Sequence, residues 1–193
     1  YLNWLDDILQ IRKTANPVLS TKEYDFKIYD NPTEMMDAII EKNRIANKAR
    51  VTAGYCWDWN SKSDIHKMDI VMPQFNFKKQ WNLGSDGMLW IVGEDSVNQI
   101  GCIHTCQGLE LDYVGVIVGP DIIYRNGKIL VDPSKRSKND RSVFGYKKLM
   151  NQNPDGTRDI LRSIIKNTYR TLMTRGMKGC YVYFVDQELS NLF

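Results

Sequence analysis

Apolar residues recur along this chain in two alternating patterns, one typical of helices and one of buried strands. Helical spacing places apolar side chains on one face over residues 2–11, 32–48 and 159–173. Short runs rich in β-forming residues lie between and after them, at residues 24–29, 50–55, 99–104, 113–118 and 181–185. The run 113–118 is apolar without interruption, as in a strand buried on both faces. The alternation predicts an α/β fold, with a parallel sheet flanked by helices.

Local signals mark one helix start and one hairpin. Asn31 precedes Pro32, the order of an N-cap and a first-turn proline, so we expect a helix to begin there. Asn126 and Gly127 separate two β-rich runs within residues 122–131. This dipeptide is typical of the two-residue turn of a β-hairpin.

Two stretches interrupt the alternation. Residues 61–87 are polar and aromatic without a clear period, and we expect them to be irregular. Residues 132–157 are rich in lysine and arginine and form a basic, mobile insertion in our interpretation. The part from 134 to 148 either tracks a phosphate backbone or is a solvated, flexible loop. We treat residues 1–193 as a single domain, with the hairpin and basic insertion at 120–157.

Composition changes this picture little. With 193 residues and a net charge of +3, the chain suits one compact domain and permits contact with nucleic acid without demonstrating it. It has no long apolar run and no signal-peptide pattern, so we expect a cytoplasmic protein without a membrane span. Because the chain opens at Tyr1, within an expected helix, we also expect it to be part of a longer protein.

The four cysteines form no C-x-x-C pair, and we expect them to be reduced thiols. Cys102, His104 and Cys106 alternate in a way that suggests a metal site, but structural zinc takes four ligands. One strand face also gives poor tetrahedral geometry. We therefore expect no metal site, and interpret Cys102 and Cys180 as small buried hydrophobic residues.

An arginine stands at the end of the last long helix, in the order Thr174-Arg175-Gly176, just before a strand. A guanidinium is always charged and binds phosphate oxygens with two N–H groups, so Arg175 is a candidate arginine finger for phosphoryl transfer. The alternative is an arginine that complements the helix dipole.

A second candidate segment lies before the apolar run 113–118. Gly108 allows the backbone to approach a phosphate, Gln107 is suited to orient a phosphate or water, and Glu110 to accept from a ribose hydroxyl. His104 and Thr105 are candidate donors to a nucleic-acid backbone. The alternative is a glycine turn with a solvated glutamate.

Trp57 and Trp59 stand in an aromatic segment after the run 50–55. Their rings are suited to stack on bases of a single strand. The alternative is that both rings pack at the rim of the core.

These segments together resemble a known family. The order His104-Thr105-x-Gln107-Gly108-x-Glu110, followed further on by Asn167-x-Tyr169-Arg170-x-Leu172-x-Thr174-Arg175-Gly176, resembles motifs V and VI of superfamily 1 helicases. More closely, residues 1–186 resemble the C-terminal half of a bacterial, Schlafen-related helicase-like family of unknown function. The segment 50–59 shares this resemblance.

The resemblance implies a second RecA-like domain, a three-layer sheet of the P-loop NTPase type without its own P-loop. ATP and Mg²⁺ would be bound mainly by an upstream P-loop RecA-like domain, and single-stranded DNA or RNA would cross both domains. Arg175 would be the finger, with Thr174 beside it. Gly108 would lie near the γ-phosphate and Glu110 near the ribose.

In the same family pattern, His104 and Thr105 would face the strand, and Tyr169 and Arg170 would support the helix that ends at Arg175. The chain departs from the pattern at Gln107, where many members have lysine, and at Gly176, where many have alanine. No G-x-x-x-x-G-K-[ST] sequence and no Walker-B-type run occur, so we expect no ATP hydrolysis by this chain alone.

The leading hypothesis is therefore the second motor lobe of a nucleic-acid-dependent ATPase or helicase. The alternative is a non-catalytic module that binds nucleic acid or protein on the same scaffold. A nuclease is a third class, because Asp58, Asp64, His66 and Asp69 form an acidic cluster, but the restriction-type order of Pro-Asp and (Asp/Glu)-x-Lys is missing.

Overall fold

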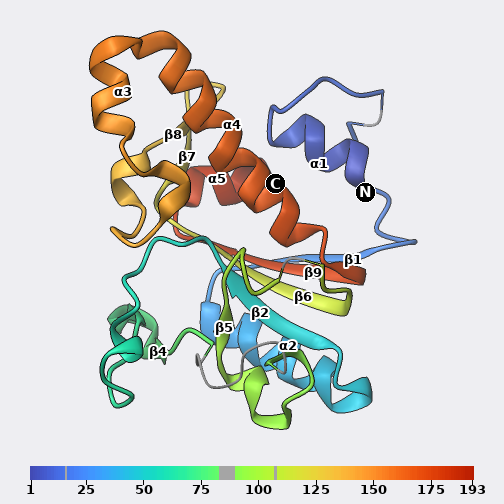
Figure 1. The fold of residues 1–193 in the computed structure, drawn as a ribbon. Coiled ribbons are helices and arrows are strands. Elements are labelled where there is room, and N and C mark those ends of the chain that lie inside the picture. The colour runs from blue at the N-terminus through green and yellow to red at the C-terminus, as the bar shows by residue number, and fades with distance from the viewer. Residues whose placement is uncertain (16, 83–89, 107) are drawn as a thin grey trace.

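A five-stranded parallel sheet forms the centre of the molecule (Figure 1). The computed structural model describes residues 1–15, 17–82, 90–106 and 108–193. The strand order is β1-β9-β6-β2-β5. These strands are β1 (Asp25–Tyr29), β2 (Ala49–Ala53), β5 (Ile100–Gly101), β6 (Leu111–Val118) and β9 (Gly176–Phe184).

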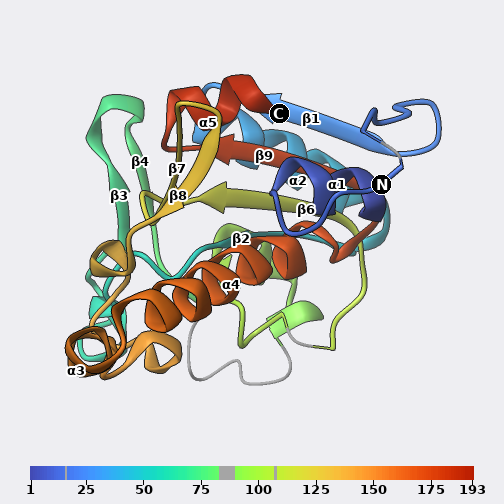
Figure 2. The same ribbon diagram turned by 90° about the horizontal axis from the view of Figure 1, so that it is seen from above.

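Helices cover both faces of this sheet (Figures 1 and 2). On one face lie α1 (Leu2–Ile8), α4 (Pro154–Met173) and α5 (Gln187–Leu192). On the other lies α2 (Pro32–Ala46). The predicted α/β fold, with helices on both sides of a parallel sheet, is confirmed.

Each face of the sheet has its own apolar core. Along β9, Cys180, Val182 and Phe184 face the core under α4, whereas Tyr181 and Tyr183 face the core over α2. This alternation follows from the two-residue period of a strand. Burial raises the pKa of the Cys180 thiol to about 12, which agrees with its interpretation as a small buried hydrophobic residue. None of the four cysteines forms a disulfide.

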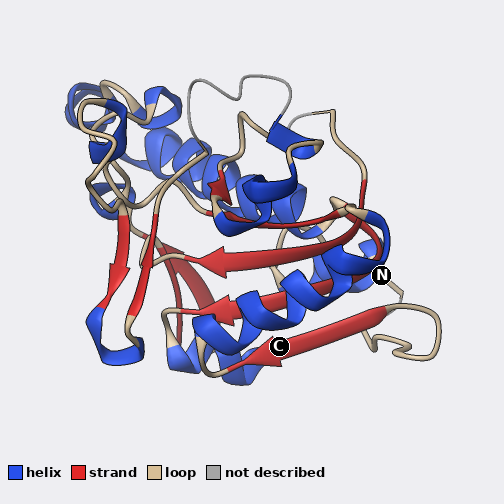
Figure 3. Ribbon diagram, turned by 90° about the horizontal axis from the view of Figure 1, so that it is seen from below, coloured by secondary structure: helices blue, strands red, loops and turns tan. Residues whose placement is uncertain are grey.

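Two antiparallel hairpins lie outside the main sheet (Figure 3). They pair β3 (Ile70–Met72) with β4 (Phe77–Lys79), and β7 (Ile122–Arg125) with β8 (Lys128–Val131). Asn126 and Gly127 have φ values of 50° and 78° at the tip of the second hairpin, which confirms the predicted turn.

The sequence prediction differs from the structure at several segments. The irregular stretch predicted at 61–87 is wrong where it covers the first hairpin, since Ile70, Met72 and Phe77 pack into the core over α2; residues 83–87 lie outside the described residues. The strand expected at 99–104 is only Ile100–Gly101, because the chain turns away from β2 after Gly101.

The helix boundaries are closer to expectation. Asn31 caps α2 by accepting a hydrogen bond from the Thr33 backbone N–H, at 2.8 Å, as predicted. The last long helix is longer than expected and begins at Pro154, with Asn153 as its cap. Gly176 begins β9, shortly after α4 ends at Met173.

The basic stretch is structured. It contains two short 3-10 helices, Pro133–Lys135 and Arg141–Val143, followed by α3 (Tyr146–Gln152). Arg136, between the two 3-10 helices, is only 6% exposed. The interpretation of this stretch as a solvated loop is therefore wrong for Arg136 and for α3.

Among the described residues, no helix has both the length and the apolar character to cross a bilayer.

Candidate functional site

The two segments singled out by the motif analysis meet where β6 and β9 begin, at Leu111 and Gly176, which we call the amino edge. The Leu111 backbone N–H donates to the Arg175 carbonyl at 2.9 Å. Arg175 Nη1 donates to the Leu109 carbonyl at 3.4 Å. Because β6 and β9 are parallel neighbours, the chain segments that enter them lie side by side.

The Arg175 side chain is half-buried and held from both segments. Its Nε donates to the Thr171 carbonyl at 3.1 Å, in the last turn of α4. The Thr174 hydroxyl donates to the same carbonyl at 3.0 Å. These contacts satisfy an acceptor at the end of the helix, which agrees with the alternative role of Arg175 as a helix-end cation. Within the described residues, Nη2 has no hydrogen-bond partner, so the fork of the guanidinium is only partly used.

The loop from Cys102 to Glu110 approaches the amino edge with an exposed glycine. Gly108 has a φ of +77°, and a Cβ built on it meets no atom within 4 Å. The glycine is therefore favoured by backbone conformation rather than by lack of space. Glu110 is exposed to solvent beside it. Gln107, the candidate for orienting a phosphate or water, lies outside the described residues.

The departure at Gly176 has a structural reason. Leu111 pairs with Gly176 and Tyr113 with Gly179, so the strand register shifts and β9 bulges there. A Cβ on Gly176 would lie 2.1 Å from the Gly179 carbonyl oxygen. Alanine therefore does not fit this backbone.

The candidate nucleic-acid residues gather around Trp81 and Asn82. Trp57 and Trp59 follow β2, and Trp81 Nε1 donates to the Trp57 carbonyl at 3.3 Å. Next to Trp81, Asn82 Oδ1 accepts from the Thr105 hydroxyl at 2.7 Å. Trp57, Trp59 and Thr105 thus lie around Trp81 and Asn82, and His104 is exposed beside Thr105.

The tryptophans that follow β2 pack against the core, as the alternative interpretation has it. Trp57 and Trp59 are half-buried against the core over α2, and the Trp59 ring centroid lies 6.3 Å from that of Trp81. Part of each ring stays accessible. The structure therefore places Arg175 against Leu109, next to Gly108, and links Thr105 to the Trp57 segment through Asn82 and Trp81.

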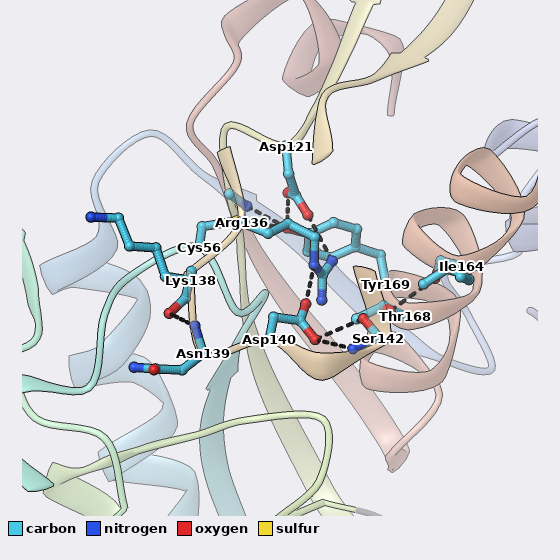
Figure 4. A network of polar contacts seen from close by, with 12 residues as sticks. Cys56, Asp121, Arg136, Lys138, Asn139, Asp140, Ser142, Ile164, Thr168 and Tyr169 are labelled. Atoms are coloured by element: carbon cyan, nitrogen blue, oxygen red, sulfur yellow. Dashed lines mark hydrogen bonds and ion pairs between the residues drawn. The ribbon is translucent and has the colours of Figure 1, made fainter. Parts of the chain in front are cut away.

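Sequence reasoning missed a buried charged cluster at the other end of the strands, where β2 and β6 end at Ala53 and Val118, which we call the carboxyl edge. Arg136 donates through Nη1 to Asp121 at 2.8 Å and through Nε to Asp140 (Figure 4). All three side chains are at most 1% exposed.

Tyr169 completes this cluster from α4. Its hydroxyl donates to Asp121 and accepts from the Gly119 backbone N–H at 2.9 Å. Burial, together with the charge of Asp121, holds the pKa of Tyr169 well above its usual value, so the phenol stays a neutral donor. The tyrosine of the helicase-like motif therefore ties α4 to the end of β6.

The thiol nearest this cluster is Cys56, whose Sγ lies 3.8 Å from the Tyr169 hydroxyl. Burial and the Asp121 carboxylate raise its pKa well above the usual range. A thiol held protonated in this way is not a nucleophile.

A second buried arginine lies at the start of β2. Arg50 is fully buried and donates to Asn43 Oδ1 at 2.6 Å, Ser96 Oγ at 3.0 Å and the Gly93 carbonyl at 3.0 Å. Burial lowers its pKa to about 10. Its partners join α2 to the segment before β5, so its role in this structure is to hold those segments together.

The described residues contain no group of three or more His, Cys, Asp or Glu side chains arranged to hold a metal ion. We expected Cys102, His104 and Cys106 to share one strand face, and this expectation is wrong. His104 and Cys106 lie in a turn after β5.

Comparison with known proteins identifies the family. The family model of the Schlafen group 3 DNA/RNA helicase domain matches residues 1–186. The chain belongs to this family. An uncharacterized protein of Saccharomyces cerevisiae is 31% identical over 202 residues, which cover 97% of the chain and 43% of the yeast protein. No solved structure matches the chain.

The Schlafen-related resemblance is thus confirmed at the level of a helicase-domain family, with a relative in yeast. The chain spans less than half the length of that relative. The family description assigns no role to any single residue, so the roles of Arg175 and of the loop 102–110 rest on their geometry.

Proposed function

We propose that this Schlafen group 3 chain is the second motor lobe of a nucleic-acid-dependent ATPase, with Arg175 as its arginine finger. The supporting observation is the meeting of two motif segments at the amino edge. Arg175 lies against the Leu109 carbonyl, next to Gly108 and Glu110 in sequence. A cation, an exposed backbone turn and a carboxylate are the groups that a nucleotide's phosphates and ribose require.

In this proposal Arg175 stabilises negative charge on the γ-phosphate of a nucleotide bound mainly by another lobe. Its guanidinium is already oriented by the Thr171 and Leu109 carbonyls. A charged group held in place before the reaction costs no reorganisation when charge develops. Thr174 positions the end of the helix, and Gly108 and Glu110 face the nucleotide. ATP with Mg²⁺ supplies the phosphoryl group, and the other lobe supplies the metal ligands.

The proposed contacts with the nucleotide and with the strand come from neighbouring parts of the sequence, at 108–110 and 104–105. The Glu110 end of the loop 102–110 lies at the amino edge, and Thr105 is bonded to Asn82 beside the Trp57 and Trp59 segment. We propose that Thr105 and His104 contact a single strand of DNA or RNA beside the Trp57 and Trp59 segment.

A non-catalytic binding module is the second candidate, and one sequence feature is compatible with it. The chain contains no G-x-x-x-x-G-K-[ST] sequence, so it lacks the lysine that holds the β- and γ-phosphates. Both candidates therefore predict no hydrolysis by the chain alone. They differ in whether the full-length protein hydrolyses ATP.

Single-strand-stimulated ATP turnover of the full-length protein tests the proposal. Arg175→Ala is expected to lower kcat by about 10³-fold or more, while nucleotide binding persists. Arg175→Lys should restore little, because an ammonium lacks the planar fork. Arg44→Ala, an exposed arginine of α2, is the matched control and should match the wild type.

Equal turnover in Arg175→Ala and the control would remove Arg175 from the site. A full-length protein that is inert with both DNA and RNA would favour the binding module.

A further inference from the structure

The excess positive charge of this chain is confined to one segment, residues 133–152, which we call the basic segment. It contains six lysine or arginine residues and one aspartate, Asp140. Since the whole chain has 26 basic and 23 acidic residues, 20 basic and 22 acidic residues remain elsewhere. Clustered charge of this kind is the footprint expected of a surface that binds a polyanion.

The exposed cations of the basic segment are not used within the fold. The side chains of Lys135, Lys138, Arg141, Lys147 and Lys148 are exposed and make no ion pair or hydrogen bond with any other described residue. The sixth cation, Arg136, is the buried partner of Asp121 and Asp140. One arginine therefore anchors the segment, and five cations face solvent.

The residues that follow Arg136 bond to residues 55–58, the segment that carries Trp57. The Ser137 backbone N–H donates to the Tyr55 carbonyl at 2.9 Å. The Ser137 hydroxyl donates to Asp58 Oδ1 at 2.7 Å, and the Lys138 backbone N–H donates to the same oxygen at 3.3 Å. Asp58 lies between Trp57 and Trp59 in the sequence, so Ser137 and the Lys138 backbone lie beside the segment that carries both tryptophans at the carboxyl edge.

The basic segment also forms a groove of about 410 Å³, whose lining includes Lys138, Lys147, Phe144 and Tyr146. Phe144 is 82% exposed, which is unusual for a phenylalanine. Cations alternating with accessible aromatic rings are the arrangement that binds single strands, because lysines contact phosphates while rings stack on bases. An acidic protein would use the cations but would leave the exposed ring without a base to stack on.

We propose that the basic segment is a binding surface for single-stranded nucleic acid that continues the strand path from Trp57 and Trp59 across Lys138, Phe144 and Lys147. This inference rests on the proposed function for its choice of a single strand as ligand. The buried Arg136 anchor holds the surface in place before binding, which lowers the ordering cost of association.

The test is the affinity of the full-length protein for labelled oligothymidylate and oligouridylate, measured without nucleotide over a range of salt concentrations. Lys138→Ala combined with Lys147→Ala should lower the slope of log K against log salt by about 1.4, at about 0.7 per phosphate contact. The same contacts predict about 25-fold weaker binding near 0.1 M salt. Lys13→Ala with Lys22→Ala removes two exposed lysines outside the segment and should leave both values unchanged.

Phe144→Ala separates stacking from charge. It should weaken binding by about fivefold or more without changing the salt slope, and Phe144→Tyr should retain affinity. Because Phe144 is exposed, neither change is expected to alter folding, which thermal unfolding checks.

Equal slopes for the two lysine pairs would overturn the inference, and capture of an acidic peptide in place of either oligonucleotide would assign the surface to a protein. The Arg175 test would be unaffected by either result, because strand affinity is measured here without turnover. No binding of either strand by the wild type would count against both proposals.

Discussion

The two edges of the sheet hold their charged side chains differently. At the carboxyl edge, Asp121, Arg136 and Asp140 are almost completely buried, and Arg136 bonds to both carboxylates. At the amino edge, Arg175 is half-buried against two backbone carbonyls, and Glu110 is exposed. The buried charges at the carboxyl edge therefore hold the chain together, whereas Arg175 and Glu110 at the amino edge stay accessible to a ligand.

The largest loss of stability should follow from replacing Arg136, the cation between the two buried carboxylates. Arg136→Met removes the cation and leaves two buried carboxylates facing each other, which is expected to destabilise the fold by about 3–5 kcal/mol. Urea unfolding of the chain measures this free energy. Arg141→Met, an exposed arginine five residues on, should change it by less than about 0.5 kcal/mol. Similar losses in both variants would mean that the carboxyl edge is not pinned by Arg136.

A smaller loss should follow from removing a single hydroxyl of the same cluster. Tyr169→Phe leaves the Gly119 N–H without its acceptor and Asp121 without one donor, so we expect a loss of about 2–3 kcal/mol. Tyr146→Phe is the matched control, because that half-exposed hydroxyl has no partner among the described residues and should contribute little. A loss confined to the control would contradict the difference between the two edges.

The same contrast explains what the sequence could predict. The apolar run at 113–118, the cap at Asn31 and the Asn126-Gly127 turn are local signals, and each corresponds to the structure. Arg175 is a candidate from sequence because the helix end and the following strand are adjacent in the chain. These features depend on neighbours a few residues away, which is what a periodic pattern records.

The carboxyl edge could not be predicted in this way. No apolar period around Arg136 distinguishes it from the neighbouring Lys135 and Lys138, and its buried partner Asp121, which also binds Tyr169, is distant in the sequence. The hairpin of β3 and β4 was missed for a related reason, because strands of three residues are too short to show a period.

The amino edge has one backbone position that should be sensitive to added volume. Gly176→Ala would place a Cβ against the Gly179 carbonyl, so either the bulge rearranges or the fold loses about 1–3 kcal/mol. Met177→Ala, on a neighbouring exposed side chain, controls for changes in β9 itself. Unchanged unfolding of Gly176→Ala would show that the bulge is not required and that this backbone accepts alanine.

An ion pair between α1 and α4 gives the smallest and most pH-dependent effect. Asp6 accepts from Arg170 and from Arg12, whose side chains are 32% and 61% exposed, and these bonds hold the pKa of Asp6 below its usual value. Because both guanidiniums reach solvent, Asp6→Asn should cost only about 1 kcal/mol near neutral pH.

A depressed carboxyl pKa contributes stability above the unfolded value of about 3.9, and this contribution is lost as the pH falls through the folded value. The difference between the wild type and Asp6→Asn should therefore narrow in urea unfolding below about pH 4. If the difference in unfolding free energy between the wild type and Asp6→Asn stayed constant below about pH 4, Asp6 would act through packing. Solvent would then not explain why this ion pair contributes less than the buried one at Arg136.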